Sequence, residues 1–160
     1  EFVNADEIAK GLSPFNPESV AIEAGRLMLQ RIDELLERDE TFSIETTLAT
    51  KSYINLVRRA QAKGYRVHLI FFWLETSELA VQRVAERVSK GGHNIPTEVI
   101  HRRYVAGIRN LFKTFMSEVD LWMIYDNSCT PRTFVAKGGR ATDVEIVSKM
   151  TYNKIKAYVG

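Results

Sequence analysis

Short runs of β-branched or aromatic residues alternate with longer helical patterns along the chain, and this alternation limits the fold more than any other feature. Tyr65–Leu74, "YRVHLIFFWL", is the most continuous apolar run, and its composition is typical of a strand buried on both faces. Strands that alternate with helices form parallel sheets covered by helices. The sequence therefore predicts an α/β fold.

The limits of the expected elements follow from strand composition and from helix start and stop signals. Asn16 and Pro17 suit the N-cap and first position of a long amphipathic helix, and Thr50 suits the N-cap of the next helix. Gly64 lies where that second helix should stop. The remaining expected elements are helices over Ser77–Lys90, over Thr97 to about Ser117 and from about Asp143, and strands over Phe2–Asp6, Thr41–Thr46, Tyr65–Leu74, Leu121–Ser128 and, at an edge, Thr133–Lys137.

Composition fits one domain over residues 1–160 and narrows the classes of function. A net charge of +2 is too small to favour nucleic acid by itself, so any basic site has to be local. Cys129 is the only cysteine, which excludes a disulfide framework and fits a reducing cytoplasm. Val67–Leu74 is too short for a membrane span, and the acidic segment Glu1–Lys10 does not read as a signal peptide. We therefore expect a cytoplasmic protein.

Most of the expected strands end in side chains that carry carboxylate, amide or hydroxyl groups. In parallel α/β sheets, ligands bind beyond the carboxyl ends of the strands. One polar strand end is common by chance, but several on neighbouring strands predict the rim of a site. The groups are Asn4 and Asp6, Glu45 with Thr46 and Thr47, Glu75 with Thr76, and Asp126 with Asn127 and Ser128.

Two of these strand ends suit a substrate that carries a hydroxyl group. Asp6 can accept a proton from that hydroxyl, with Asn4 as a hydrogen-bonding neighbour. The alternative is that Asp6 caps a turn in the Gly- and Pro-containing loop expected after it. Glu45–Thr47 offers an acceptor and two hydroxyls, which suit a sugar hydroxyl or a metal-bound water. The alternative is a helix N-cap there, although a buried and unpaired Glu45 would be costly.

Four arginines lie on either side of a Gly-Gly-His turn in the stretch "RVAERVSKGGHNIPTEVIHRRY". Arg83 and Arg87 are four residues apart and share a helix face, and Arg102 and Arg103 follow in the next helix. Guanidinium groups match phosphate oxygens and offset the charge of a phosphoryl group in transfer. The alternative is an ordinary solvated helix pair, in which Glu86, Glu98 and water satisfy the arginines.

Other reactive side chains give weaker signals. His93 can titrate near neutrality, but a single loop histidine is usually only a polar residue. No set of His, Cys and carboxylate residues has metal-ligand spacing, so we assign no structural metal. Cys129 has no paired histidine motif, and no Gly-x-Ser-x-Gly elbow occurs.

The strand-end groups and the arginine stretch together resemble the zeta toxin family of P-loop kinases, in particular its bacterial branch of predicted ATPases. The matching stretches spread from Phe2 to Ser128, and the third of them is the specific one. They are "FVNADEIA", "FSIETTLA", "VHLIFFWLETSELAVQRVAERVSKGGHNIPTEVIHRRY" and "DLWMIYDNS".

This resemblance implies a three-layer α/β/α P-loop kinase fold and transfer of phosphate from ATP, with Mg²⁺, to a small molecule. In the toxins themselves the acceptor is the sugar hydroxyl of a UDP-linked amino sugar. Asp6 would be the base, and the acceptor or a magnesium-bound water would be held by Glu45 and Thr46, with Asn4, Thr47 and His93 nearby. Arg83 and Arg87, or Arg102 and Arg103, would close over the phosphates from a lid at about residues 77–117. Asp126, Asn127 and Ser128 would lie near the adenine.

One motif of the family does not occur in these residues. A P-loop kinase needs Gly-x-x-x-x-Gly-Lys-Ser/Thr after its first strand, and the dipeptide Gly-Lys is absent from the sequence. The resemblance begins at the second strand of the family, so the first strand and its phosphate loop are expected upstream of Glu1. Without a normally central strand, its neighbours would expose unpaired N–H and C=O groups, and a swapped segment or a second copy could pair there. We expect these residues alone to bind ATP poorly.

A non-catalytic alternative uses the same arginines. A module that keeps the fold without catalysis could recognise an anionic ligand or a nucleic acid through the Gly-Gly-His turn, with strong salt dependence. By analogy with the toxins, an antitoxin protein is a further expected partner.

Overall fold

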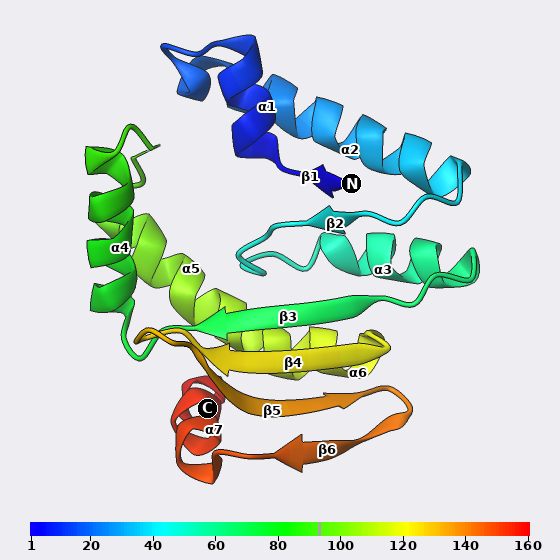
Figure 1. Cartoon of the computed structure of the whole chain (residues 1–160), viewed down its shortest axis with the longest axis vertical. Coiled ribbons are helices and arrows are strands. Elements are labelled where there is room, and N and C mark those ends of the chain that lie inside the picture. The colour runs from blue at the N-terminus through cyan, green and yellow to red at the C-terminus, as the bar shows by residue number, and fades with distance from the viewer. Residues whose placement is uncertain (93) are drawn as a thin grey trace. The chain divides into compact units, whose positions relative to one another are not determined.

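The computed structural model describes residues 1–92 and 94–160, and His93 lies outside the described residues. The chain divides into two compact units, Glu1–Thr46 and Thr47–Gly160. Each unit contains a sheet of its own: β1 and β2 pair in the first, and the second has the strand order β3-β4-β5-β6 (Figure 1). Among the described residues no helix is long and apolar enough to cross a membrane.

The first unit is a parallel strand pair with two α-helices. It consists of β1 (Phe2–Val3), α1 (Ala5–Leu12), the 3₁₀ turn η1 (Pro17–Val20), α2 (Ala21–Glu37) and β2 (Ser43–Ile44). Apolar residues at helical spacing give α2 a buried stripe that includes Met28, Ile32 and Leu36. Phe2 pairs with Ser43 and Val3 with Ile44, so the carboxyl ends of both strands lie side by side.

One expectation for the first unit is wrong, and the expected start of the long helix is confirmed only in part. The segment after Asp6, expected as a loop, is the helix α1, because the side chain of Asn4 caps its first turn. The long helix starts with Pro17 in a 3₁₀ turn, and Asn16 makes no side-chain capping bond. The strands are also shorter than expected, since β1 ends at Val3 and β2 at Ile44.

The second unit is a mixed sheet with helices between its strands. The bounds of its elements are α3 (Tyr53–Ala62), β3 (His68–Trp73), α4 (Ser77–Ser89), α5 (Thr97–Asn110), the π-helical turn η2 (Leu111–Phe115), α6 (Met116–Glu118), β4 (Leu121–Asp126), β5 (Thr133–Gly139), β6 (Thr142–Ile146), α7 (Lys149–Lys156) and the 3₁₀ turn η3 (Ala157–Val159). β3 and β4 are parallel and in register from His68↔Leu121 to Trp73↔Asp126, which puts their carboxyl ends together. β5 and β6 continue the sheet in antiparallel pairing.

The carboxyl-terminal part of this unit differs from the expectation. β5 is not at the edge, because it lies between β4 and β6. The segment from Asp143, expected as a helix, forms most of β6, and α7 begins only at Lys149. Gly64, by contrast, ends α3 as expected, with a left-handed φ of 89°.

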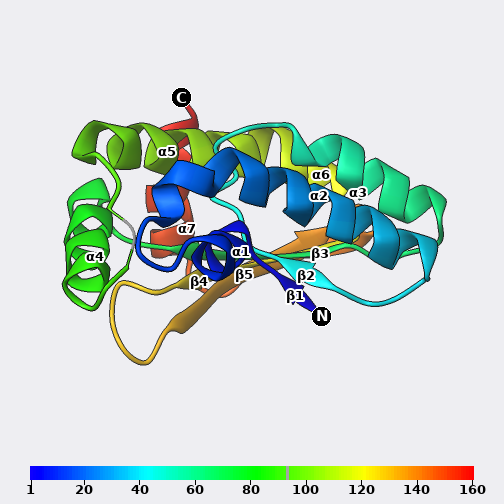
Figure 2. The ribbon, with the colours of Figure 1, turned by 90° about the horizontal axis from the view of Figure 1, so that it is seen from above.

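Helices cover one face of the β3–β6 sheet. Figure 2 shows α3, α5 and α6 over the same face, and Ile54, Ile108 and Phe115 from this layer are buried against Trp73 and Ile124 of the sheet. Leu69 and Phe71 pack against this core, whereas Ile70 and Phe72 remain 51% and 46% exposed. The expectation that Tyr65–Leu74 is buried on both faces is therefore wrong, because alternate residues of β3 face solvent.

Candidate active site

Three of the predicted site residues come together at the carboxyl ends of β1 and β2. Asn4 Nδ2 donates to Glu45 Oε2 over 3.0 Å, across 41 residues of sequence. The side-chain oxygen of Asn4 also accepts hydrogen bonds from the backbone N–H groups of Asp6, at 2.8 Å, and Glu7, at 3.3 Å. The side chain of Asn4 therefore caps the first turn of α1 and also holds the carboxylate of Glu45 by a hydrogen bond.

Asp6 and Glu45 are exposed carboxylates at this strand end. Asp6 lies in the first turn of α1. Glu45 is neither buried nor unpaired, so the costly burial considered from the sequence does not arise. Asp6 is not the capping residue of this turn, because Asn4 caps it. This arrangement offers two carboxylates to a hydroxyl-bearing ligand.

The carboxyl ends of β3 and β4 form a second, tightly bonded group. The backbone N–H of Asn127 donates to the Trp73 carbonyl at 2.8 Å, and the backbone N–H of Glu75 donates to Ser128 Oγ at 2.8 Å. The backbone N–H of Ser128 donates in turn to Asp126 Oδ1 at 2.9 Å. The side-chain oxygens of Asp126 and Ser128 thus hold the loop in shape.

The four predicted arginines fall into two kinds. Arg83 is half-buried, and its Nη2 donates to the carbonyl oxygens of Asn127, at 2.8 Å, and Ser128, at 3.3 Å. Arg87, Arg102 and Arg103 are exposed on α4 and α5. Arg83 therefore connects α4 to the end of β4.

The glycine pair between the arginine helices caps α4. Gly91 has a φ of 85°, and the N–H groups of Gly91 and Gly92 donate to the carbonyls of Val88 and Arg87 at 2.9 Å each. A Cβ on Gly92 would lie 2.6 Å from Cγ of Arg87, so only glycine fits there. The glycine pair expected as a hinge therefore forms the C-terminal cap of α4. His93, expected as a site residue, lies outside the described residues.

The comparisons with known proteins agree on one family. The family model described as "Zeta toxin" matches residues 2–134. The chain belongs to the zeta toxin family. The resemblance inferred from the strand ends and the arginine stretch is thereby confirmed.

The chain is also similar to a bacterial relative and, in fold, to a solved structure. A Haemophilus influenzae protein described as uncharacterized is 30% identical over 102 residues, which cover 64% of this chain and 73% of the relative. A structure from the PezAT chromosomal toxin-antitoxin system of Streptococcus pneumoniae superposes with a TM-score of 0.62 at 14% identity, covering 98% of this chain and 72% of that one. That likeness is one of fold, and it confirms the α/β class with a parallel, P-loop kinase-like sheet.

Two further residues, one of them in α7 beyond the stretch matched by the zeta toxin model, reach the carboxyl end of β3. Lys154 of α7 pairs with Glu75, with 2.7 Å between Nζ and Oε1. The hydroxyl of Tyr104 donates to the Leu74 carbonyl at 2.7 Å, and burial, followed by the neighbouring Tyr158, raises the pKa of Tyr104. No pattern in the sequence indicated Lys154, because its contact with Glu75 depends on the position of α7.

The segment that follows β2 is held by two residues of α5 that the sequence analysis missed. Asn110 Nδ2 donates to the Leu48 carbonyl at 2.7 Å, and Gly107 lies directly against the Thr47 carbonyl. Glycine within a helical pattern is itself a sign of close backbone approach, so Gly107 could have been noticed. Thr47 is exposed at this point.

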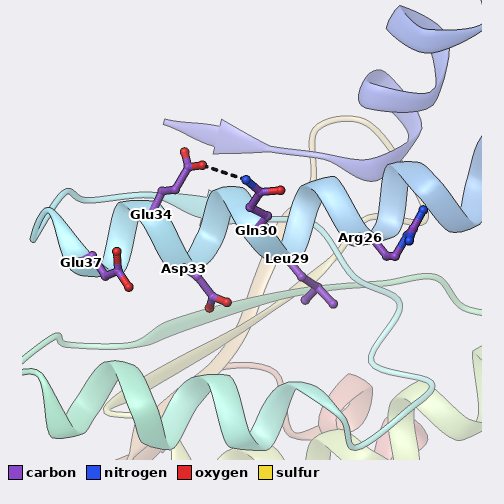
Figure 3. Close-up of a pocket in the computed structure, with 6 residues that line it drawn as sticks. All are labelled: Arg26, Leu29, Gln30, Asp33, Glu34 and Glu37. Atoms are coloured by element: carbon purple, nitrogen blue, oxygen red, sulfur yellow. Dashed lines mark hydrogen bonds between the residues drawn. The ribbon is translucent and has the colours of Figure 1, made fainter.

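A shallow pocket on α2 contains none of these residues. Figure 3 shows the side chains that line it, all on this helix: Arg26, Leu29, Gln30, Asp33, Glu34 and Glu37. Gln30 Nε2 donates to Glu34 Oε1 at 3.4 Å within this group. The pocket lacks the strand-end position expected of a site in this fold.

The zeta toxin family implies ATP and Mg²⁺, and the residues of this chain fit them only in part. Exposed arginines suit phosphate oxygens. However, the 160 residues contain no Gly-x-x-x-x-Gly-Lys-Ser/Thr stretch. The described residues also contain no group of three or more His, Cys, Asp or Glu that could hold a metal ion.

Proposed function

We propose that this chain is part of an ATP-dependent phosphotransferase that phosphorylates a hydroxyl group of a small molecule. In this proposal the chain supplies the residues that bind the acceptor molecule and the arginines that contact the transferred phosphate. A UDP-linked amino sugar is the acceptor that we expect. The observation that carries the proposal is the hydrogen bond between Asn4 and Glu45 next to Asp6, at the paired carboxyl ends of β1 and β2. Membership of the zeta toxin family supports the reaction class.

In this reaction Asp6 is the base. Its carboxylate receives the proton of the acceptor hydroxyl as the hydroxyl oxygen bonds to the γ-phosphorus of ATP, and the bond from that phosphorus to the β–γ bridging oxygen breaks to release ADP. Glu45, held by Asn4, and the hydroxyls of Thr46 and Thr47 bind neighbouring hydroxyl groups of the acceptor.

The exposed arginines have an electrostatic role in the proposal. Arg87, Arg102 and Arg103 offset negative charge on the phosphoryl group as it moves between oxygens. Arg83 contributes by holding α4 against the end of β4. The Asp126–Ser128 loop lies near the adenine in this proposal, where the half-buried Asn127 can present its side-chain amide.

The test is phosphate transfer from radiolabelled ATP to UDP-linked amino sugars by the intact protein and its variants. Asp6→Asn should lower the rate by about 100-fold or more, because it removes the proton acceptor while keeping the size of the side chain. Glu7→Gln is the matched control, since Glu7 is an exposed carboxylate in the same helical turn. Transfer by Asp6→Asn at a near wild-type rate would show that Asp6 is not the base.

A non-catalytic role is the second candidate, and the arginines favour it. Arg102 and Arg103 are exposed, and they form no hydrogen bond or ion pair within the described part of the chain. Such groups can bind an anionic ligand or nucleic acid. Binding that weakens steeply with salt, together with no phosphate transfer by the intact protein, would support this role over the kinase.

An antitoxin is the protein partner that we propose. The solved structure with the similar fold belongs to a toxin-antitoxin system. If the proposal is correct, expression of the intact protein alone arrests growth, and co-expression of a cognate small protein restores it. Normal growth on expression of an active, intact protein would contradict this partner.

A further inference from the structure

We propose that Gly107 and Asn110 of α5 are positioning residues, which hold the Thr47–Leu48 turn so that the Thr47 hydroxyl and Arg103 face the same acceptor molecule. We call these two residues the α5 clamp. The proposal rests on the phosphotransferase function proposed above and adds a device that sets the geometry of its acceptor side.

Leu48 has a backbone conformation that leucine rarely adopts. Its φ is 53°, in the left-handed region, although it is a branched apolar residue with 3% of its surface exposed. Such residues persist only where the surrounding structure fixes them, and they concentrate at functional sites. Here the side chain of Leu48 is anchored in the core of the second unit with Ile108 and Leu111.

The α5 clamp holds the backbone on both sides of this residue. The side-chain amide of Asn110 donates to the Leu48 carbonyl at 2.7 Å. Gly107 approaches the preceding carbonyl so closely that a Cβ there would lie 2.5 Å from the oxygen of Thr47. Both carbonyls of the turn are therefore located by one helix, while the side chain of Thr47 remains exposed.

The same helix face carries one of the two neighbouring arginines. Residues three and four apart share a face of an α-helix, so Arg103, Gly107 and Asn110 lie in one row. Arg102 is turned by about 100° from that row. The clamp therefore associates Thr47 with Arg103 rather than with Arg102.

A hydroxyl in a turn held against α5, together with a guanidinium group on α5, suits an acceptor that carries an anionic group beside its reacting hydroxyl. Arg103 can bind the anionic oxygens, and Thr47 can hydrogen-bond a neighbouring hydroxyl. Because transfer depends on alignment, a shift of about 1 Å in this turn can lower the rate by about 100-fold. The chain thus sets acceptor geometry through the backbone of Thr47 and Leu48.

Two variants and one control test the clamp in the intact protein. Asn110→Asp keeps the side-chain size but removes the donor to Leu48, and Gly107→Ala adds a Cβ against Thr47. Gly25→Ala is the matched control, because it adds the same methyl to helix α2 where nothing lies within 4 Å. Circular dichroism and thermal unfolding identify variants that are folded at the assay temperature.

The kinetic result separates positioning from plain stabilisation. In folded Asn110→Asp and Gly107→Ala, kcat/KM for the acceptor should fall by about 100-fold while KM for ATP stays at the wild-type value. Gly25→Ala should match the wild type. Arg103→Met should raise KM for the acceptor more than Arg102→Met does. Unchanged acceptor kinetics in folded clamp variants, or equal effects of the two arginine changes, would overturn the proposal.

Hydrogen exchange distinguishes failure of the clamp from failure of the kinase function. In Asn110→Asp the amides of Leu48 and Ala49 should exchange at least about 10-fold faster than in the wild type, with β5 and β6 unchanged. If the wild-type protein transfers no phosphate, the proposed function is wrong. Faster exchange in Asn110→Asp would then show that the α5 clamp holds the turn but has no role in phosphate transfer. Unchanged exchange in Asn110→Asp would overturn the clamp itself, whatever the activity.

Discussion

Asn4 and Glu45, 41 residues apart, are joined by a 3.0 Å hydrogen bond from the amide of Asn4 to the carboxylate of Glu45. The same amide group caps α1 through its oxygen, so one side chain serves two neighbouring strand ends. This double use requires both the donor and the acceptor of a carboxamide. Substitutions at Asn4 can therefore separate the cap from the contact with Glu45.

The first prediction concerns these substitutions. Asn4→Ala should lower the free energy of unfolding by about 0.5–2 kcal/mol, because α1 loses its N-cap. Asn4→Ser should retain most of that stability, since serine caps well, yet it loses the donor to Glu45. Urea unfolding measures both variants. Equal loss of stability in the two variants would show that the cap is not the main contribution of Asn4.

The second prediction separates Arg83 from the other arginines. Arg83→Met should lower the free energy of unfolding by about 1–3 kcal/mol, because it removes charged hydrogen bonds to two carbonyls at the end of β4. Arg102→Met is the control and should change it by no more than about 0.5 kcal/mol, since Arg102 is exposed. Denaturant unfolding that gives equal changes for both variants would contradict the structural role of Arg83.

The third prediction concerns nucleotide binding by these 160 residues alone. Calorimetric titration with Mg-ATP should show no binding with a low micromolar Kd, because the sequence contains no Gly-Lys phosphate loop. Weak residual binding should decline with added salt, since exposed arginines act through screened charge. A saturable low micromolar titration would mean that other residues of this chain bind the phosphates.

Strong local signals predicted most of the second unit. The apolar runs that became β3 and β4 and the helical patterns of α4 and α5 were correct, because composition, length and stop signals agree there. β6 was missed, although Val144 and Ile146 alternate with polar residues as in a strand. Here the pairing of β6 with β5, a tertiary contact, decides the conformation of the segment, and the local sequence pattern does not show that contact.

The sequence predicted which side chains lie at the strand ends better than it predicted the contacts that they make. The strand-end rule placed Asn4 and Glu45 at one rim, and the parallel register of β1 and β2 brings them together. The hydrogen bond from Arg83 to the Asn127 carbonyl could not be predicted, because it depends on how the loop after β4 packs against α4. The left-handed Leu48 leaves no sequence signal either, since leucine at that φ is stabilised only by its surroundings.

The last prediction concerns stability in acid and rests on Asp120. Its Oδ2 accepts hydrogen bonds from the backbone N–H of Val67, at 2.8 Å, and from Gln61, at 3.1 Å, and its Oδ1 pairs with Arg140 at 2.7 Å. Burial alone would raise the pKa of Asp120, but the bonds from Val67, Gln61 and Arg140 outweigh it and hold the pKa below its ordinary value of 3.8. Because the folded pKa is depressed, this stabilisation is present above the unfolded pKa and is lost as the pH falls through the folded value.

Urea unfolding from about pH 6 down to about pH 2 tests this sign. The free energy of unfolding should decrease toward acid in the wild type. In Asp120→Asn it should be lower at neutral pH and should fall less steeply below about pH 4, since the titrating group is gone. Asp143→Asn, which changes an exposed carboxylate of β6, is the control and should follow the wild-type slope. If stability falls toward acid as steeply in Asp120→Asn as in the wild type, other carboxylates account for the loss. Glu118 is one such group, because the hydrogen bond from Arg58 also lowers the pKa of Glu118.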